Sequence, residues 1–255
     1  MESNRQNREK QESNILFGMH PIFEAIGAKK KIEKVWLKKG LDGEQFKNLI
    51  GLLTENDIPF QFVPVERLNK FTKGKHQGVV AQLALLDYTP IEDAVEIAFS
   101  KSKAPIFLLL DGVSDVRNFG AIARTAECAG ANCIVLPAKG GASITPDSIK
   151  TSAGALMRMP VSKVPNLKSA LYYLQECGFT LVAATEKCDS LLYDIDFTAP
   201  VAIVMGSEDK GISEGVLSLC TQKGRIPMMG HIGSLNVSAA AAIILYEALR
   251  QRVAK

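Results

Sequence analysis

Residues 106–137 read IFLLLDGVSDVRNFGAIARTAECAGANCIVLP, and this stretch decides the fold class. Two apolar runs, at 106–110 and 133–136, flank a segment whose apolar residues recur at helical spacing. Neither run alternates polar and apolar residues, which is typical of strands that are covered on both faces. The stretch therefore predicts a strand, a helix and a second strand, the building unit of an α/β domain with a parallel sheet.

Three further apolar runs extend this pattern toward the C-terminus. FTLVAATE (179–186), VAIVMGSE (201–208) and GRIPMMG (224–230) predict strands, with helices between them. Because ligands bind beyond the carboxyl ends of strands in such sheets, the loops that follow the runs are the candidate sites.

Each candidate loop also has a plain structural interpretation. Asn118 is a possible helix N-cap and Arg124 a possible surface arginine. Gly206 and Gly211 fit an ordinary glycine-rich turn around Glu208, which is neither a GxGxxG turn nor a P-loop. Taken singly, the loops do not identify a reaction.

The remaining chain divides by composition. Residues 1–14 have no apolar residue after Met1 and predict a disordered tail. Residues 15–88 predict a small α/β domain, residues 89–103 a linker, and residues 104–255 the parallel-sheet domain described above.

Composition excludes several classes of protein. The longest apolar run, Ala239–Tyr246, is far too short to cross a membrane, and the chain does not open like a secretory signal. The five cysteines form no CxxC pair and the three histidines lie far apart, which argues against a zinc site and predicts reduced thiols in a cytoplasmic protein.

The net charge of +3 lies entirely in residues 1–88, which hold 14 Lys and Arg against 11 Asp and Glu. Six lysines fall within Lys29–Lys39, and Lys73 and Lys75 add to them. A local lysine cluster suits an anionic partner such as an RNA backbone, although a solvated lysine-rich turn explains the charge equally well.

Three segments taken together resemble a known family. NFGAIART (118–125), VMGSEDKGIS (204–213) and IPMMGHIGSLNVSAAAAIILYE (226–247) are similar to the three motifs of the SpoU (TrmH) family of S-adenosylmethionine-dependent RNA ribose 2'-O-methyltransferases. LFGMHPIFEAI (16–26) and GKHQGVVAQL (74–83) resemble the two ends of that family's N-terminal RNA-binding domain, which is similar to ribosomal protein L30e.

The resemblance implies a trefoil-knotted (SPOUT) methyltransferase domain, a homodimer, S-adenosylmethionine as cofactor, and no metal. The arrangement is most similar to bacterial enzymes that methylate a guanosine of large-subunit ribosomal RNA. The residues that match the family's catalytic positions are Arg124, Asn118, Glu208, Asn236 and Ser238. Those that match its cofactor loops are Thr185, Gly206, Gly211, Ile226, Met228, Ser234, Leu235 and Asn236.

The resemblance implies that Arg124 acts on the ribose 2'-hydroxyl, and removal of the hydroxyl proton by an arginine conflicts with elementary chemistry. A guanidinium stays protonated at physiological pH, so it is a poor base for a ribose hydroxyl. We therefore expect Arg124 to stabilise the developing alkoxide, with Asn118 and Glu208 positioning it or the ribose.

Four other functions stay open from the sequence alone. These are methylation of a transfer RNA ribose, methylation of a base, binding of RNA without catalysis, and nucleotide-dependent oxidoreduction. Base methylation at carbon requires a thiol nucleophile, but the only cysteine near the motifs, Cys128, is expected to be a core thiol. Oxidoreduction lacks its GxGxxG fingerprint.

Overall fold

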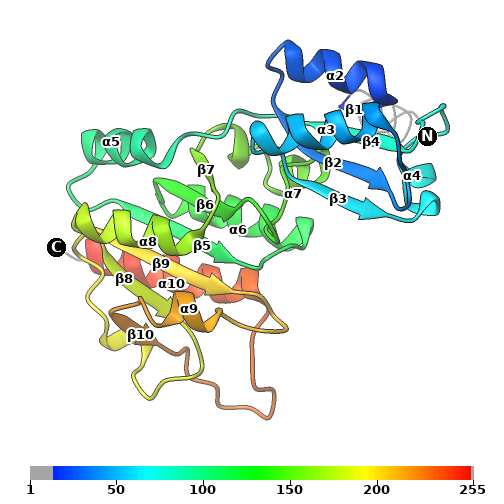
Figure 1. The fold of residues 1–255 in the computed structure, drawn as a ribbon. Coiled ribbons are helices and arrows are strands. Elements are labelled where there is room, and N and C mark those ends of the chain that lie inside the picture. Colours follow the sequence, from blue (N-terminus) through cyan, green and yellow to red (C-terminus); the bar gives the residue numbers. More distant parts are fainter. Residues whose placement is uncertain (1–13, 254–255) are drawn as a thin grey trace. The chain divides into compact units, whose positions relative to one another are not determined.

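The computed structural model describes residues 14–253, which form two compact units (Figure 1). The first unit ends at Asp87 and the second begins at Tyr88. The predicted disordered tail lies outside the described residues except for Asn14, which is buried and whose carbonyl oxygen accepts a hydrogen bond from Leu83 N.

The first unit is a four-stranded sheet with helices on both faces. Its elements are β1 (Ile15–Phe17), α2 (Met19–Gly27), β2 (Ile32–Lys38), α3 (Glu44–Glu55), β3 (Phe60–Val63), α4 (Val65–Phe71) and β4 (Val79–Leu83). Strand β4 pairs antiparallel with β1 and β2, and β2 pairs parallel with β3.

Alternating side chains of β2 explain the two layers of the first unit. Val35 and Leu37 pack in one cluster with residues of α2 and α3. Trp36 points to the opposite face, where its ring stacks on Phe71 of α4 at a centroid distance of 4.2 Å.

The second unit contains a six-stranded sheet in which every pair of neighbours is parallel, as the apolar runs predicted. The elements are α5 (Ile91–Lys101), β5 (Ile106–Asp111), α6 (Val116–Cys128), β6 (Cys133–Pro137), α7 (Pro146–Thr151), a 3-10 turn (Ala155–Met157), β7 (Val161–Val164), α8 (Leu167–Glu176), β8 (Thr180–Ala184), a second 3-10 turn (Leu192–Asp194), β9 (Val201–Gly206), α9 (Glu214–Leu217), β10 (Gln222–Gly224) and α10 (Val237–Val253). The strand order is β10-β8-β9-β5-β6-β7.

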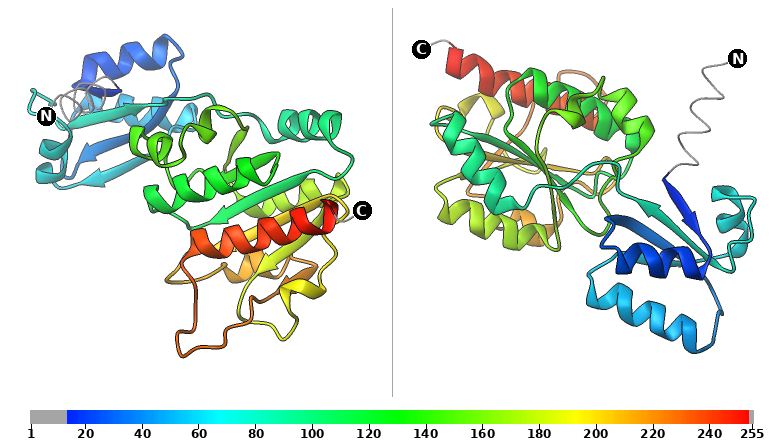
Figure 2. Two further views of the ribbon diagram at one scale, coloured as in Figure 1. Left: turned by 180° about the vertical axis from the view of Figure 1, so that it is seen from behind. Right: turned by 90° about the horizontal axis from the view of Figure 1, so that it is seen from above.

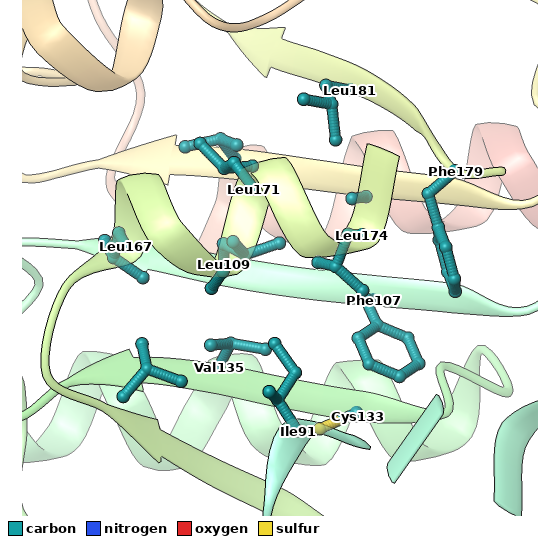
Figure 3. Close-up of a cluster of buried hydrophobic side chains, with 14 of the residues drawn as sticks. Ile91, Phe107, Leu109, Cys133, Val135, Leu167, Leu171, Leu174, Phe179 and Leu181 are labelled. Carbon is teal, nitrogen blue, oxygen red and sulfur yellow. The ribbon is translucent and has the colours of Figure 1, made fainter. Parts of the chain in front are cut away.

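Helices cover both faces of this sheet, which explains why its strands are apolar throughout. Helices α5, α8 and α9 pack on one face, while α6 and α10 lie side by side on the other (Figures 1 and 2). Figure 3 shows the first of these layers, where Phe107 and Leu109 of β5 meet Leu171 and Leu174 of α8. Because the strands are parallel, their carboxyl ends meet at one edge, and the loops from β5, β8, β9 and β10 begin there.

The segment 89–103, expected to be a linker, is part of the second unit. It contains α5, whose residues Ile91, Ala94, Val95 and Ala98 are buried in the same cluster as β5 and β6. The apolar spacing at intervals of three and four gives this helix a face that packs on the sheet.

The prediction of a strand through Ile226 and Met228 is wrong. Strand β10 ends at Gly224, and Ile226–Gly230 is a loop. Pro227 has no N–H group to donate to a neighbouring strand, which disfavours a longer β10. The sequence also missed the four-residue strand β7. The knot and the similarity to L30e stay predictions.

We expect Arg252 to stabilise the second unit. Its guanidinium donates hydrogen bonds to the carbonyl oxygens of Phe197, Ala199 and Ala104, which precede β9 and β5, and burial lowers its pKa. Arg252→Ala should lower the free energy of unfolding by about 2–3 kcal/mol, because three carbonyl groups lose a charged donor. Urea denaturation followed by circular dichroism measures this change.

The matched control for that measurement is Arg158→Ala. Arg158 is exposed and its side chain makes no hydrogen bond or ion pair with another residue between 14 and 253. Its substitution should change the free energy of unfolding by less than about 0.5 kcal/mol. Equal effects of the two substitutions would contradict the structural role of Arg252.

Candidate active site

A cavity of about 390 Å³ lies at the carboxyl ends of β8, β9 and β10. Three loops line it: the loop after Ala184, the loop after Met205, and the segment that joins β10 to α10. Its volume falls within the range of about 300–1,000 Å³ found for small-molecule sites. The predicted cofactor residues that line it are Thr185, Gly206, Gly211, Ile226, Met228, Ser234 and Leu235.

The loop after β9 folds back on itself at Gly206. A Cβ atom added to Gly206 would lie 2.1 Å from the carbonyl carbon of Gly211 and 2.2 Å from Ile212 N. The turn is closed by a hydrogen bond of 2.8 Å from Gly211 N to Ser207 O. Glycine is therefore required at position 206 by the loop's own backbone, rather than by space for a ligand.

Glu208, at the tip of this loop, joins the starts of two helices. Its Oε1 atom accepts hydrogen bonds from Asn118 Nδ2 at 3.2 Å, from Val237 N at 3.2 Å and from Asn236 Nδ2. Asn236 Nδ2 also donates to Asn118 Oδ1 at 3.1 Å. One carboxylate oxygen thus holds the first turn of α6 and the first residue of α10 against the loop of β9.

Asn236 also caps α10. Its Oδ1 atom accepts hydrogen bonds from the backbone N–H and the hydroxyl of Ser238, at 2.9 and 2.5 Å. An Asn side chain that accepts from the second N–H of a helix is an N-cap. The same side chain therefore starts the helix with its oxygen and binds Glu208 with its nitrogen.

Asn118 is not the N-cap of α6. Asp115 takes this role, since its Oδ1 accepts from Arg117 N and Asn118 N at 3.0 and 2.8 Å. The Asn118 amide is therefore free to reach Glu208 and Asn236. The structure brings together four of the predicted catalytic residues: Asn118, Glu208, Asn236 and Ser238.

Arg124 does not join this cluster. It is exposed on α6, and its side chain makes no hydrogen bond or ion pair with any residue from 14 to 253. It is also absent from the cavity lining.

Cys128, at the end of the same helix, is exposed, so the expectation of a core thiol there is wrong. Cys128 faces solvent because the buried apolar face of α6 is formed by other residues, namely Phe119, Ile122, Ala123 and Ala126.

Sequence reasoning missed several charged residues of the cavity. Lys187, Asp209 and Lys210 line it together with Glu186 and Glu208. Asp111, at the end of β5, supports the β9 loop by accepting a hydrogen bond of 2.8 Å from Ser213 N to its Oδ2. The signal was available in principle, because each of these residues follows the carboxyl end of an apolar run.

Within residues 14–253, no group of three or more His, Cys, Asp or Glu side chains is arranged to hold a metal ion. In the same part of the chain, no helix has both the length and the apolar character needed to span a bilayer.

Comparison with protein families identifies the chain. The family model described as "SpoU rRNA Methylase family" matches residues 105–246, which is more than half of the chain. The chain belongs to this family. A second model, described as "RNA 2'-O ribose methyltransferase substrate binding", matches residues 15–89 of this SpoU-family chain. The family predicted from the sequence motifs is thereby confirmed, and the protein is an RNA 2'-O-ribose methyltransferase.

Two relatives match this SpoU-family chain over nearly their whole length. YacO of Bacillus subtilis (strain 168), assigned to the TrmH family of tRNA/rRNA methyltransferases, is 34% identical over 242 residues, covering 95% of this chain and 97% of YacO. The 23S rRNA (guanosine-2'-O-)-methyltransferase RlmB of Pseudomonas syringae pv. tomato is 34% identical over 241 residues, covering 94% of this chain and 96% of RlmB.

The fold also matches that of a solved SpoU methyltransferase. AviRb from Streptomyces viridochromogenes, crystallised in complex with AdoMet, superposes with a TM-score of 0.60 at 24% identity. The match covers 94% of this chain and 91% of AviRb. At this identity the likeness concerns the fold.

The three donors on Glu208 lead to a testable expectation for this SpoU-family site. Glu208→Ala removes the acceptor that joins the β9 loop to Asn118, Asn236 and Val237, so single-turnover methyl transfer should fall about a hundredfold, in the range seen when one preorganised polar group is removed. Glu208→Gln keeps one oxygen acceptor for these donors but replaces the second carboxylate oxygen by an NH2 group, so it should lose about as much transfer as Glu208→Ala. A Glu208→Gln protein that transfers methyl groups at nearly the wild-type rate would mean that the hydrogen-bonded junction, and not the second carboxylate oxygen, is what matters.

Proposed function

We propose that the protein transfers a methyl group from S-adenosylmethionine to a ribose 2'-hydroxyl of RNA, and that the substrate is a guanosine of large-subunit ribosomal RNA. The observation that carries the activity is the junction of Asn118, Glu208 and Asn236 beside a cavity at the carboxyl ends of the strands. The guanosine is favoured by the 34% identity to RlmB over almost its full length.

The cavity fits S-adenosylmethionine chemically. Ile226, Met228 and Leu235 offer apolar contacts to a flat adenine ring, and the exposed backbone of the loops offers hydrogen-bond partners. Charges of both signs, from Glu186, Lys187, Glu208, Asp209 and Lys210, suit a ligand that carries a sulfonium, an ammonium and a carboxylate. When bound, this cofactor supplies an activated methyl group on sulfur.

The chain's own residues would position and polarise the ribose. Oε1 of Glu208 is occupied by three donors, whereas Oε2 accepts no hydrogen bond from the residues at positions 14–253. Oε2 is therefore the oxygen that can accept a proton or a hydrogen bond from the ribose hydroxyl. Arg124 would stabilise the oxygen as it gains negative charge.

We also propose that the protein is a homodimer, as the family resemblance implies. Helices α6 and α10 lie side by side on one face of the sheet, and α10 presents Tyr246 and Val253 at 50% and 73% exposure. Exposed large apolar side chains on one helix are consistent with an interface. Sedimentation velocity at micromolar concentration should give the mass of two chains, and a fully active monomer would refute the dimer.

The substrate is tested by mapping ribose methylation across all RNA from cells that lack the protein. We expect one guanosine of large-subunit ribosomal RNA to lose its 2'-O-methyl group and to regain it with the wild-type gene but not with Arg124→Ala. Loss of a transfer RNA methyl group would replace the proposed substrate, an alternative that the name of the YacO relative keeps open. An unchanged methylation map and no transfer in vitro would favour RNA binding without catalysis. Action on ribosomal RNA implies a cytoplasmic location.

A further inference from the structure

A second cavity, of about 400 Å³, lies at the same edge of the sheet as the first, but at the ends of β5, β6 and β7. Asp111, Pro137 and Pro165 line it from the ends of these strands, and Lys168 and Gly215 line it from the starts of α8 and α9. Its lining shares no residue with the first cavity. Of the three sequence motifs, only the last residue of the second, Ser213, lines this cavity.

One loop separates the two cavities. Gly206–Gly211 line the first cavity, whereas Ser213 and Gly215 line the second. The hydrogen bond from Ser213 N to Asp111 Oδ2 fixes the loop between them. A group bound in the second cavity would therefore contact the far side of the loop that carries Glu208.

The second cavity has an excess of positive charge. Its charged side chains are Lys139, Lys168 and Asp111. Both lysines are exposed and neither makes an ion pair with another residue in the part of the chain that the structure describes. One oxygen of Asp111 is already engaged by Ser213 N. Two unpaired ammonium groups beside one carboxylate suit an anionic ligand.

Gly215 lies within van der Waals reach of one of the two cations. A Cβ atom built at Gly215 would lie 3.4 Å from Cδ and 3.7 Å from Nζ of Lys168. The Lys168 side chain therefore lies along the wall of the cavity. Its ammonium group is placed beside the first turn of α9, which follows the β9 loop.

We propose that this second cavity binds a phosphate group of the RNA backbone beside the ribose that is methylated, with Lys139 and Lys168 as its cationic side chains. The assignment rests on the proposed function, because every ribose of an RNA strand has a phosphate on each side. Lysine binds phosphate as a point charge, and such contacts hold the strand in register without reading its sequence. The site would set the position of the ribose through the loop that the two cavities share.

The test compares Lys139→Ala/Lys168→Ala with wild type in the full-length protein. Binding to transcribed large-subunit ribosomal RNA is measured over a series of salt concentrations. The two lysines bind a single phosphate group, so the double variant should reduce the magnitude of the slope of log affinity against log salt by about 1. Affinity at low salt should fall roughly tenfold or more. Affinity for S-adenosylmethionine, measured by calorimetry, should not change.

The matched control removes two lysines from the opposite edge of the same sheet. Lys101 and Lys103 are exposed, lie just before β5 and line neither cavity. Lys101→Ala/Lys103→Ala should leave the salt slope as in wild type, and Lys139→Arg/Lys168→Arg should retain it. If the cavity variant keeps the wild-type slope, or if the control pair loses as much, the phosphate site is wrong.

Affinity and salt slope require no catalysis, so the two proposals fail separately. A wild-type protein that binds this RNA but transfers no methyl group to it would refute the proposed function, while the slope still decides on the cavity. A wild-type protein that binds no RNA would refute both.

Discussion

Arg124→Ala is expected to lower single-turnover methyl transfer about a hundred- to a thousandfold, the usual cost of removing a charge that stabilises a developing oxyanion, which is the role proposed for this arginine. The affinity for S-adenosylmethionine should stay within about twofold of wild type, because Arg124 does not line the cavity. Folding should be unaffected, since the Arg124 side chain is exposed and makes no hydrogen bond or ion pair with the rest of residues 14–253. Calorimetry with the cofactor and a single-turnover assay with RNA measure the two effects separately.

Two comparisons sharpen the result for Arg124. Arg124→Lys should restore little activity, because an ammonium on a flexible stem does not reproduce the planar guanidinium. Arg117→Ala, an exposed arginine two turns earlier on the same helix, is the control and should keep the transfer rate within about threefold. The catalytic assignment fails if Arg124→Ala transfers methyl groups at nearly the wild-type rate, or if its main defect is cofactor affinity.

Gly206→Ala, unlike Arg124→Ala, should lower the affinity for S-adenosylmethionine about a hundredfold, which corresponds to roughly 3 kcal/mol. The added Cβ atom would lie 2.1 Å from the backbone of Gly211, so the turn closed by Gly211 N and Ser207 O has to open. Overpacking of this kind typically costs 1–3 kcal/mol or more. Opening the turn would displace both the wall of the cavity and Glu208.

Gly211→Ala is the matched substitution on the same loop. A Cβ atom at Gly211 would have no neighbour within 4 Å, but the residue has a φ of +67°. The expected penalty is therefore the backbone cost of about 1–2 kcal/mol for a non-glycine residue in the left-handed region, with a loss of affinity of about thirtyfold or less. A Gly206→Ala protein that binds the cofactor as tightly as Gly211→Ala would show that the loop tolerates the clash by moving elsewhere.

The sequence by itself determined the class of the second unit and the loops that matter. The uninterrupted apolar runs at Ile106–Leu110 and Val201–Met205 predicted strands buried on both faces, and both are central strands of the parallel sheet. Burial on one or two faces is a local property that shows directly in the spacing of apolar residues. The same property shows in α3 (Glu44–Glu55), whose buried residues Phe46, Leu49 and Leu53 recur at helical spacing.

Local patterns did not determine where short or irregular segments end. The run through Ile226 and Met228 has the apolar character of a strand, yet β10 ends at Gly224 and those side chains line a cavity. Apolar residues are required in a ligand cavity as well as in a core, so composition alone does not separate the two uses. The segment 89–103 was ambiguous for a related reason, since only packing on the sheet makes α5 part of the second unit.

Only the tertiary structure decided which distant residues meet. Asn118 and Asn236 are 118 positions apart, and their amide groups touch because β9 lies next to β5 and α10 lies beside α6. Gly206 appeared in the sequence as a place for a ligand, but its own loop occupies the space. Lys139 and Lys168 carried no motif at all and share a cavity only through the order of β5, β6 and β7. Strand order and loop closure depend on contacts between segments that are remote in the chain, and the periodicity of a single segment carries no record of its partners.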